Sequence, residues 1–227
     1  MQQATIMRRL VAELTGSAIL LATVVGSGIM AESLSGGNVA LALLANAIAT
    51  GAILFVLITV FGPVSGAHFN PAVTFSMSLA GDIGRRDAIL YMVVQVAGAV
   101  AGVWLAHAMF GLPLFQFSTK LRAGGGQWIS EAVATSGLIL TIYGTLSARR
   151  DAVPATVALY ITSAYWFTAS TSFANPAVTL ARMLSDTFAG IRPQDAPIFV
   201  GVQLASALAS TLFARWLFGK AVERRAL

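Results

Sequence analysis

Six apolar stretches, each close to the length that crosses a bilayer, constrain the fold of this chain more than any other feature. A transmembrane helix needs about 20 predominantly apolar residues. Only 10% of the 227 residues are charged, and mean hydropathy is +0.79. The sequence therefore predicts an all-α integral membrane protein. Its expected spans are 9–30, 39–61, 88–109, 128–147, 152–169 and 197–218.

The basic residues predict that both chain ends face the cytoplasm, because cytoplasmic loops carry an excess of Lys and Arg. This bias accounts for the net charge of +5 without a nucleic-acid partner, and none is expected. With both ends inside, ten basic residues lie on the inner side and four on the outer side. The inner ones are Arg8, Arg9, Arg85, Arg86, Arg149, Arg150, Arg215, Lys220, Arg224 and Arg225; the outer ones are Lys120, Arg122, Arg182 and Arg192.

The composition leaves little for catalysis or metal binding. Cysteine is absent and there are two histidines, so the sequence offers neither a thiolate nucleophile nor a cysteine metal site. We expect no catalytic residue, metal or cofactor, and a protein that is not an enzyme.

Two Asn-Pro-Ala triplets, 70–72 and 175–177, stand 105 residues apart, and Val-Thr follows each. Asparagine is a good N-cap and proline is well suited to the first helical position, so each triplet predicts a helix start. The apolar stretches that follow, 71–79 and 176–184, are too short to cross a bilayer and are expected to be half-helices. A backbone break at bilayer depth is tolerated only where it is buried in protein or lines a watery cavity.

An internal repeat relates the two halves. Glu13 and Glu131 begin the first span of each half, and Gln95 and Gln203 correspond in the third. Three spans per half is an odd number, so the second copy must be inverted, which brings the half-helices together from opposite faces. We expect a single membrane domain over 1–227, with a first repeat at 1–120 and a second, inverted repeat at 121–227.

The chain resembles the aquaporin, or major intrinsic protein, superfamily over essentially its whole length. The resemblance is carried by 65–74, 174–179, the two glutamates and the two glutamines. It implies a right-handed bundle of six transmembrane helices plus two half-helices, and a homotetramer in the lipid bilayer with one pore per subunit.

The triplets predict a pore at the bilayer midplane. Each half-helix presents unpaired N–H groups and a partial positive charge at its amino end, and Asn70 and Asn175 add amide donors. The carbonyls of the segments before them should form a ladder of acceptors, from Gly66, Ala67, His68, Thr171, Ser172 and Phe173. We expect His68 to brace its loop rather than to act as a gate.

The carboxylates of Glu13 and Glu131 are expected to accept hydrogen bonds from the loops before the half-helices, a role that the resemblance also implies. A carboxylate in an apolar span is costly unless it faces the protein interior and finds partners. The alternative is a proton relay, but no further titratable groups line up across the membrane.

The expected selectivity constriction departs from the pattern of water channels, in which an arginine follows the second Asn-Pro-Ala. Here that position is Val178, and the family's spacing puts the other positions at Thr50, Ser163 and Ser172. Such a ring holds no aromatic ring, histidine or fixed charge, so it should be wide, with hydroxyls on one side and an apolar surface on the other. Inward folding of Phe173, Trp166 or Phe167 would instead close the gap.

Arg182 lies one helical turn beyond Val178 and so on nearly the same face. It is expected to pair with Asp186 or to extend to lipid headgroups. The alternative places it over the outer vestibule, where it would attract weakly acidic or anionic solutes.

Residues 175–182, together with 185–193, are similar to a bacterial aquaporin subgroup associated with arsenic-resistance genes. This resemblance implies passage of arsenite and methylated arsenicals. The sequence thus predicts a passive channel for small neutral solutes, with possible glycerol, urea and water permeation, in a bacterial inner membrane. The alternatives are a general aquaglyceroporin or water channel without a metalloid role, an ion-coupled secondary transporter, and a structural membrane protein with a closed pore.

Overall fold

The computed structural model describes residues 4–219, and Lys220, Arg224 and Arg225 of the expected inner charge lie outside them. Every regular element in the described residues is helical. The helices are α1 (Ile6–Leu34), α2 (Val39–Ser65), α3 (Pro71–Ala80), α4 (Arg85–Met109), α5 (Gly125–Ala148), the short 3-10 helix η1 (Arg150–Ala152), α6 (Val153–Phe167), α7 (Pro176–Arg182) and α8 (Ala196–Phe218).

Five of these helices, α1, α2, α4, α5 and α8, are long and apolar enough to cross a membrane. The expected fifth span, 152–169, is realised by the shorter α6, which has 15 residues and a length of about 22 Å at 1.5 Å per residue. Its first turn is taken up by η1, and Pro154 stands at the start of α6. The protein is therefore a multi-pass membrane protein in which one span is short.

The two half-helices begin where the sequence predicts. Asn70 caps α3 by accepting a 2.8 Å hydrogen bond from the backbone N–H of Ala72, and Asn175 caps α7 by accepting one of 2.9 Å from Ala177. Proline occupies the start of each helix, where its missing N–H leaves no hydrogen bond unmade. Both breaks are thus built from the same local chemistry.

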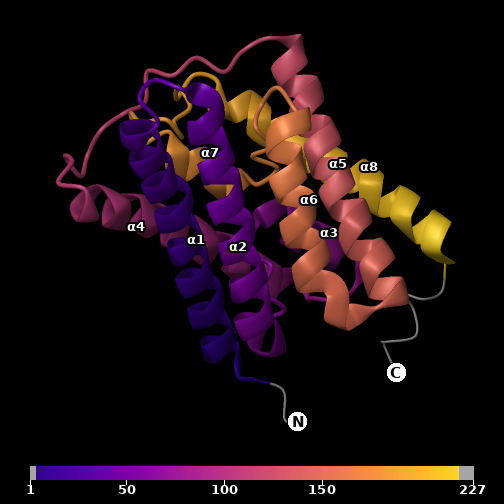
Figure 1. Cartoon of the computed structure of the whole chain (residues 1–227). Coiled ribbons are helices and arrows are strands. Elements are labelled where there is room, and N and C mark those ends of the chain that lie inside the picture. The colour runs from indigo at the N-terminus through magenta and orange to yellow at the C-terminus, as the bar shows by residue number, and fades with distance from the viewer. Residues whose placement is uncertain (1–3, 220–227) are drawn as a thin grey trace.

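The half-helices lie in the middle of the bundle and connect its two halves (Figure 1). α3 packs against α8 as well as α4, and α7 packs against α4 as well as α8. Each half-helix therefore contacts the third long helix of both halves. The start of α1 and the end of α8 lie at the same side of the molecule, the lower side in Figure 1.

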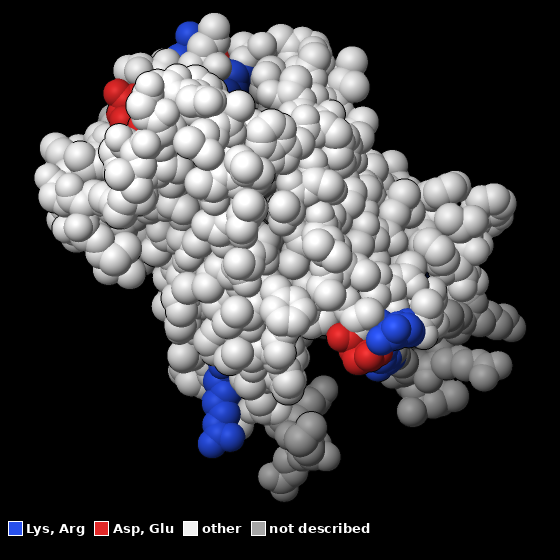
Figure 2. Space-filling model, viewed as in Figure 1, with Lys and Arg blue, Asp and Glu red and all other residues white. Residues whose placement is uncertain are grey.

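On the face that Figure 2 shows, the charged side chains lie towards the top and the bottom, with a broad band free of surface charge between them. Many large apolar side chains of the long helices are exposed, among them Ile48 and Phe55 on α2 and Val93 on α4. Contact of such an apolar surface with lipid is favourable, whereas its contact with water is unfavourable.

Glycines on α4 allow its backbone to touch that of α1. A Cβ atom at Gly98 would lie 2.3 Å from the carbonyl oxygen of Leu14, and one at Gly102 would lie 2.1 Å from that of Ala18. Small residues at helix crossings permit this close approach in membranes. The α1–α4 contact fixes the helix that carries Glu13 against the helix that carries Gln95.

Gly102→Ala should lower stability because the added methyl group meets backbone rather than a flexible side chain. Overpacking of this kind costs about 1–3 kcal/mol, which should appear as a lower unfolding temperature in detergent. The matched control is Gly201→Ala on α8, where a Cβ meets no atom within 4 Å and the better helix propensity of alanine is worth about 1 kcal/mol. Equal unfolding temperatures for the two variants would contradict the close α1–α4 contact.

Candidate solute pathway

The carboxylate of Glu13 holds the loop that precedes α3. It is fully buried and accepts hydrogen bonds from the backbone N–H groups of His68 (3.0 Å) and Phe69 (2.7 Å). Ser65 Oγ and Gln95 Nε2 donate to the same carboxylate at 2.6 and 2.8 Å. These four donors satisfy a charge that would otherwise be costly to bury.

Glu131 repeats this arrangement for the loop before α7. Its carboxylate accepts from the backbone N–H groups of Phe173 and Ala174, both at 2.9 Å, and from Gln203 Nε2 at 2.6 Å. Gln203 also donates to Thr179 Oγ1, as Gln95 does to Thr74 Oγ1, and both of these bonds measure 2.9 Å. The correspondence extends from the glutamates through the glutamines to the half-helices.

The asparagine side chains cross-link the two loops. Asn70 Nδ2 donates to the carbonyl of Ala174, and Asn175 Nδ2 donates to the carbonyl of Phe69, both at 2.8 Å. An amide NH₂ carries two hydrogens, so one remains on each asparagine beyond this clasp. Both side chains border the central cavity, where the remaining hydrogen can meet a solute.

The loop backbone is strained in a repeating way. Ala67 and Phe69 have φ of 51° and 48°, and the equivalent Ser172 and Ala174 have 51° and 47°. Positive φ is unfavourable for residues with a Cβ by about 1–2 kcal/mol each. The hydrogen bonds to Glu13 and Glu131 offset this cost.

The strained conformation leaves a row of carbonyls without protein donors. Within the part of the chain that the structure describes, no residue donates to the carbonyl oxygens of the six loop positions expected to form the acceptor ladder: Gly66, Ala67, His68, Thr171, Ser172 and Phe173. All but Thr171 border the cavity. His68 also bonds Thr74 Oγ1 through Nδ1 at 3.1 Å, so it is braced while it faces the cavity.

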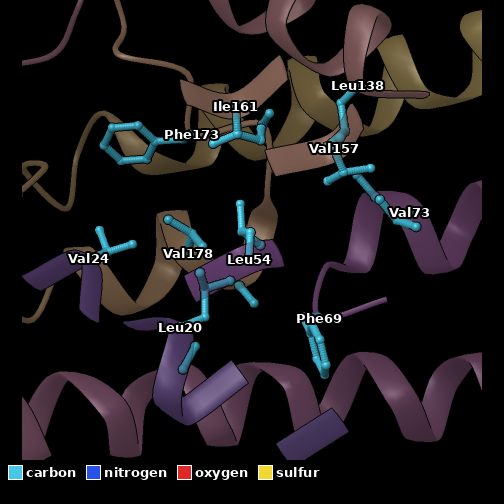
Figure 3. Close-up of a cluster of buried hydrophobic side chains, with 14 of the residues drawn as sticks. Leu20, Val24, Leu54, Phe69, Val73, Leu138, Val157, Ile161, Phe173 and Val178 are labelled. Carbon is cyan, nitrogen blue, oxygen red and sulfur yellow. The ribbon is translucent and has the colours of Figure 1, made fainter. Parts of the chain in front are cut away.

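A cavity of about 290 Å³ runs between the helices. Figure 3 shows the apolar part of its wall, to which long helices, α3, α7 and both loops contribute side chains. The labelled residues are Leu20, Val24, Leu54, Phe69, Val73, Leu138, Val157, Ile161, Phe173 and Val178. The polar groups of the wall are few and comprise His68, Asn70, Asn175, Thr50, Tyr165, Arg182, Asp82 and Ser172.

The structure places Thr50, Ser172 and Val178 on the cavity wall, but it places Ser163 elsewhere. Ser163 is exposed on the outer surface of α6 and bonds back to the carbonyl of Tyr160. The face of α6 that borders the cavity carries Ile161 and Tyr165, and a residue two positions from Ile161 points about 200° away from it. The expectation for Ser163 is therefore wrong.

Tyr165 takes the place that was assigned to Ser163. Its hydroxyl is 3.2 Å from Thr50 Oγ1, so an aromatic residue stands beside Thr50, whereas the expected constriction ring contains none. The signal was present in the sequence as the i, i+4 spacing of Val157, Ile161 and Tyr165, which places them on one helix face. Trp166 and Phe167, which could have closed the gap, are exposed.

Arg182 also differs from its expected setting. It is 2% exposed, borders the cavity, and donates through Nε to the carbonyl of Ala189. Its Cζ lies 3.5 Å from the centroid of the Phe173 ring. Asp186 instead accepts from the backbone N–H and the hydroxyl of Thr119, so the expected pairing of Arg182 with Asp186 is wrong. Arg182 brings to the cavity wall a charged side chain that the expected constriction residues lack.

The loop between α4 and α5 adds positive charge beside Arg182. Arg122 donates to the carbonyls of Gly190 and Ser170 at 2.8 and 3.0 Å. Burial lowers its pKa to about 10, so it remains charged at neutral pH. Burial, with the charges of Arg122 and Arg182, lowers the pKa of Lys120 to about 8. The charge bias predicts Lys120, Arg122 and Arg182 on the outer side, but no sequence pattern indicates that they lie close together.

Two capped half-helices, cross-linked at a cavity within an apolar bundle, define a membrane channel for small solutes. The chain belongs to the major intrinsic protein family, because the model of the family described as "Major intrinsic protein" matches residues 1–174. Members of this family are channels, so the chain is a channel and not an enzyme.

Known proteins resemble the chain along most of its length. It is 56% identical over 217 residues to the aquaglyceroporin AqpS of Rhizobium meliloti (strain 1021), covering 96% of this chain and 93% of that protein. It is 34% identical over 152 residues to the probable aquaporin PIP2-8 of rice, covering 64% of this chain and 54% of that protein.

A solved structure has the same fold. The aquaglyceroporin from Plasmodium falciparum superposes with a TM-score of 0.69 over 94% of this chain and 96% of that chain, at 20% identity. At that identity the likeness establishes the fold alone.

Proposed function

We propose that the protein is a passive, bidirectional channel for small uncharged solutes, with arsenous acid and methylated arsenicals as preferred cargo and with glycerol, urea and water also permeating. The observation that carries the proposal is the mixed lining of the cavity. Val178, Leu20 and Leu54 supply apolar surface, while Asn70, Asn175 and the Thr50–Tyr165 pair supply hydroxyl and amide groups. A small neutral solute that has both hydroxyl groups and an apolar surface fits such a lining.

The arsenical cargo is favoured by the size and chemistry of the solute. Arsenous acid is a neutral trihydroxide about the size of glycerol, so it can exchange its water hydrogen bonds for those of the loop carbonyls and asparagines. A methylated arsenical would place its methyl group against Val178. The similarity of 175–182 and 185–193 to channels associated with arsenic resistance supports the same cargo.

Two alternatives make different predictions. A general aquaglyceroporin would pass glycerol and water without preference for arsenicals, and the name of the Rhizobium meliloti relative favours glycerol. A secondary transporter would also have an inverted repeat and broken helices, but its flux would saturate and depend on an ion gradient.

The proposed setting is a bacterial inner membrane with both termini in the cytoplasm and with four copies in a homotetramer. The two described chain ends lie on one side of the molecule (Figure 1), as this orientation requires. The two repeats at 1–120 and 121–227 within one domain are part of the same proposal, and the paired contacts of Glu13 and Glu131 support it.

The test is solute flux into proteoliposomes that contain the purified protein. Water, glycerol and urea are followed by stopped-flow light scattering, and arsenite and methylarsenite by the arsenic trapped after rapid filtration. We expect all five to exceed protein-free vesicles, with linear concentration dependence and no response to a proton or sodium gradient. Flux of water alone, or arsenical flux at the background of empty vesicles, would overturn the proposed cargo, and gradient-driven accumulation would overturn the passive mechanism.

A further inference from the structure

The guanidinium of Arg182 has donors that the protein does not use. Of its five N–H groups, only Nε–H donates to a described residue, the carbonyl of Ala189. The two Nη atoms have no hydrogen-bond partner among the residues that the structure describes, yet they are not fully buried. They are therefore accessible, and the residue borders the cavity. Four N–H groups are therefore available to whatever enters.

The charge of Arg182 has no ion-pair partner within residues 4–219, where the ion pairs are Arg9–Asp87, Arg149–Asp151 and Arg192–Asp195. An unpaired buried charge is strongly unfavourable. The carboxylate of Glu131, which lies in the same half of the protein, is engaged by Phe173, Ala174 and Gln203. The site therefore attracts an anion from outside the chain.

A second guanidinium reinforces this field. The Cζ atom of Arg122 lies 4.9 Å from the centroid of the same Phe173 ring that Arg182 covers. Nε and Nη1 of Arg122 donate to backbone carbonyls, and Arg122 is not one of the residues that border the cavity, so its contribution to the site is its charge. Lys120 adds a third basic group, held at the carbonyl of Phe188.

The wall also offers hydroxyl groups for a bound oxyanion. Thr50 and Tyr165 border the same cavity, and either hydroxyl can donate outward when the other donates to it. A planar guanidinium binds a carboxylate through two parallel hydrogen bonds. The remaining carboxylate lone pairs can accept from such hydroxyls.

We infer that the pore contains a binding site for a small monovalent carboxylate or oxyanion, held by the free N–H groups of Arg182 on the side opposite the chain ends. An anion bound there stands in the path of neutral solutes, so it competes with them. The inference deepens the proposed function. Only the measurement of glycerol flux rests on that function, whereas the measurement of unfolding temperature does not.

The test uses formate as the probe, with sodium chloride at equal ionic strength as the reference. The first readout is the unfolding temperature of the purified protein in detergent, because a ligand that binds only the folded state stabilises it. The second is glycerol flux in proteoliposomes. We expect formate to raise the unfolding temperature and to reduce glycerol flux progressively to the background of empty vesicles.

Three variants locate the site. Arg182→Gln should lose both effects of formate, whereas Arg182→Lys, which keeps the charge and is the safer variant for folding, should retain a weakened form of each. The matched control is Arg192→Gln, an arginine in the neighbouring loop that pairs with Asp195, and it should respond like the wild type.

Each contrary outcome has a distinct meaning. The inference would be overturned if Arg182→Gln responded to formate as strongly as the wild type does. If Arg182→Gln fails to fold, a response of Arg182→Lys equal to that of the wild type would overturn it. The absence of any formate effect on the wild type would also overturn it. If the wild type shows no glycerol flux but formate still stabilises it through Arg182, the anion site stands and the proposed function fails.

Discussion

Glu131→Ala should abolish solute flux and destabilise the fold. The backbone N–H groups of Phe173 and Ala174 would lose their acceptor. A buried donor without a partner costs about 1–3 kcal/mol, so the free energy of unfolding should fall by roughly 2–6 kcal/mol for the two groups. The loop would then relax from the positive φ angles at Ser172 and Ala174 and carry its carbonyls out of the cavity wall.

The measurement combines thermal unfolding in detergent with glycerol flux in proteoliposomes. Glu32→Ala is the matched control, since Glu32 is exposed on α1 and should change neither quantity. The unfolding temperature and the glycerol flux of Glu131→Gln should lie between those of the wild type and Glu131→Ala. The carbonyl of the glutamine can replace one carboxylate oxygen, while its NH₂ group faces a donor. Wild-type flux through Glu131→Ala would show that the loop holds its shape without the carboxylate.

The effect of such a change should not stay in one half of the protein. Asn70 of the first half bonds the carbonyl of Ala174, and Asn175 of the second bonds that of Phe69. A loop released from Glu131 therefore withdraws an acceptor from the opposite half-helix cap. The clasp makes the two braces cooperative, which is the reason for expecting complete loss of flux rather than a partial decrease.

The capped half-helices, their glutamate braces and the six helical stretches could be anticipated from the sequence because each depends on local chemistry or on a regular spacing. An Asn-Pro pair caps a helix wherever it stands. A carboxylate in an apolar span must find donors, and the unpaired N–H groups of the nearby loop are the available ones. The same order of glutamate, Asn-Pro-Ala triplet and glutamine in the two halves then reveals the repeat.

The cavity wall was less predictable because it depends on how helices rotate and on where long side chains find partners. The family spacing predicts Ser163 at the constriction, but the shorter α6, entered through η1, presents Tyr165 to the cavity instead. The sequence spacing predicts that Arg182 pairs with Asp186. Its actual contacts, the Phe173 ring and the carbonyl of Ala189, arise from the folding of two loops that no local pattern links.

Val178→Arg should reduce glycerol and arsenical flux far more than water flux. Val178 is 6% exposed and lies on the cavity wall. A longer side chain there must extend into the cavity, because Leu20 and Leu54 already occupy the apolar wall around it (Figure 3). A decrease of about tenfold corresponds to about 1.4 kcal/mol added to the barrier, and we expect at least this for glycerol.

The charge of the new arginine works in the same direction as its size. Arg182 lies four residues on, and like charges at this spacing on a helix repel, so the new guanidinium should turn away from it and across the path. Val178→Thr is the matched control, since it keeps the branched shape and adds only a hydroxyl, and it should retain glycerol flux. Stopped-flow glycerol and water rates, with filtration for arsenite, measure the comparison. If Val178→Arg passes glycerol as fast as Val178→Thr, the narrow part of the path lies elsewhere, and Arg182 with Tyr165 and Thr50 would then be the group that limits it.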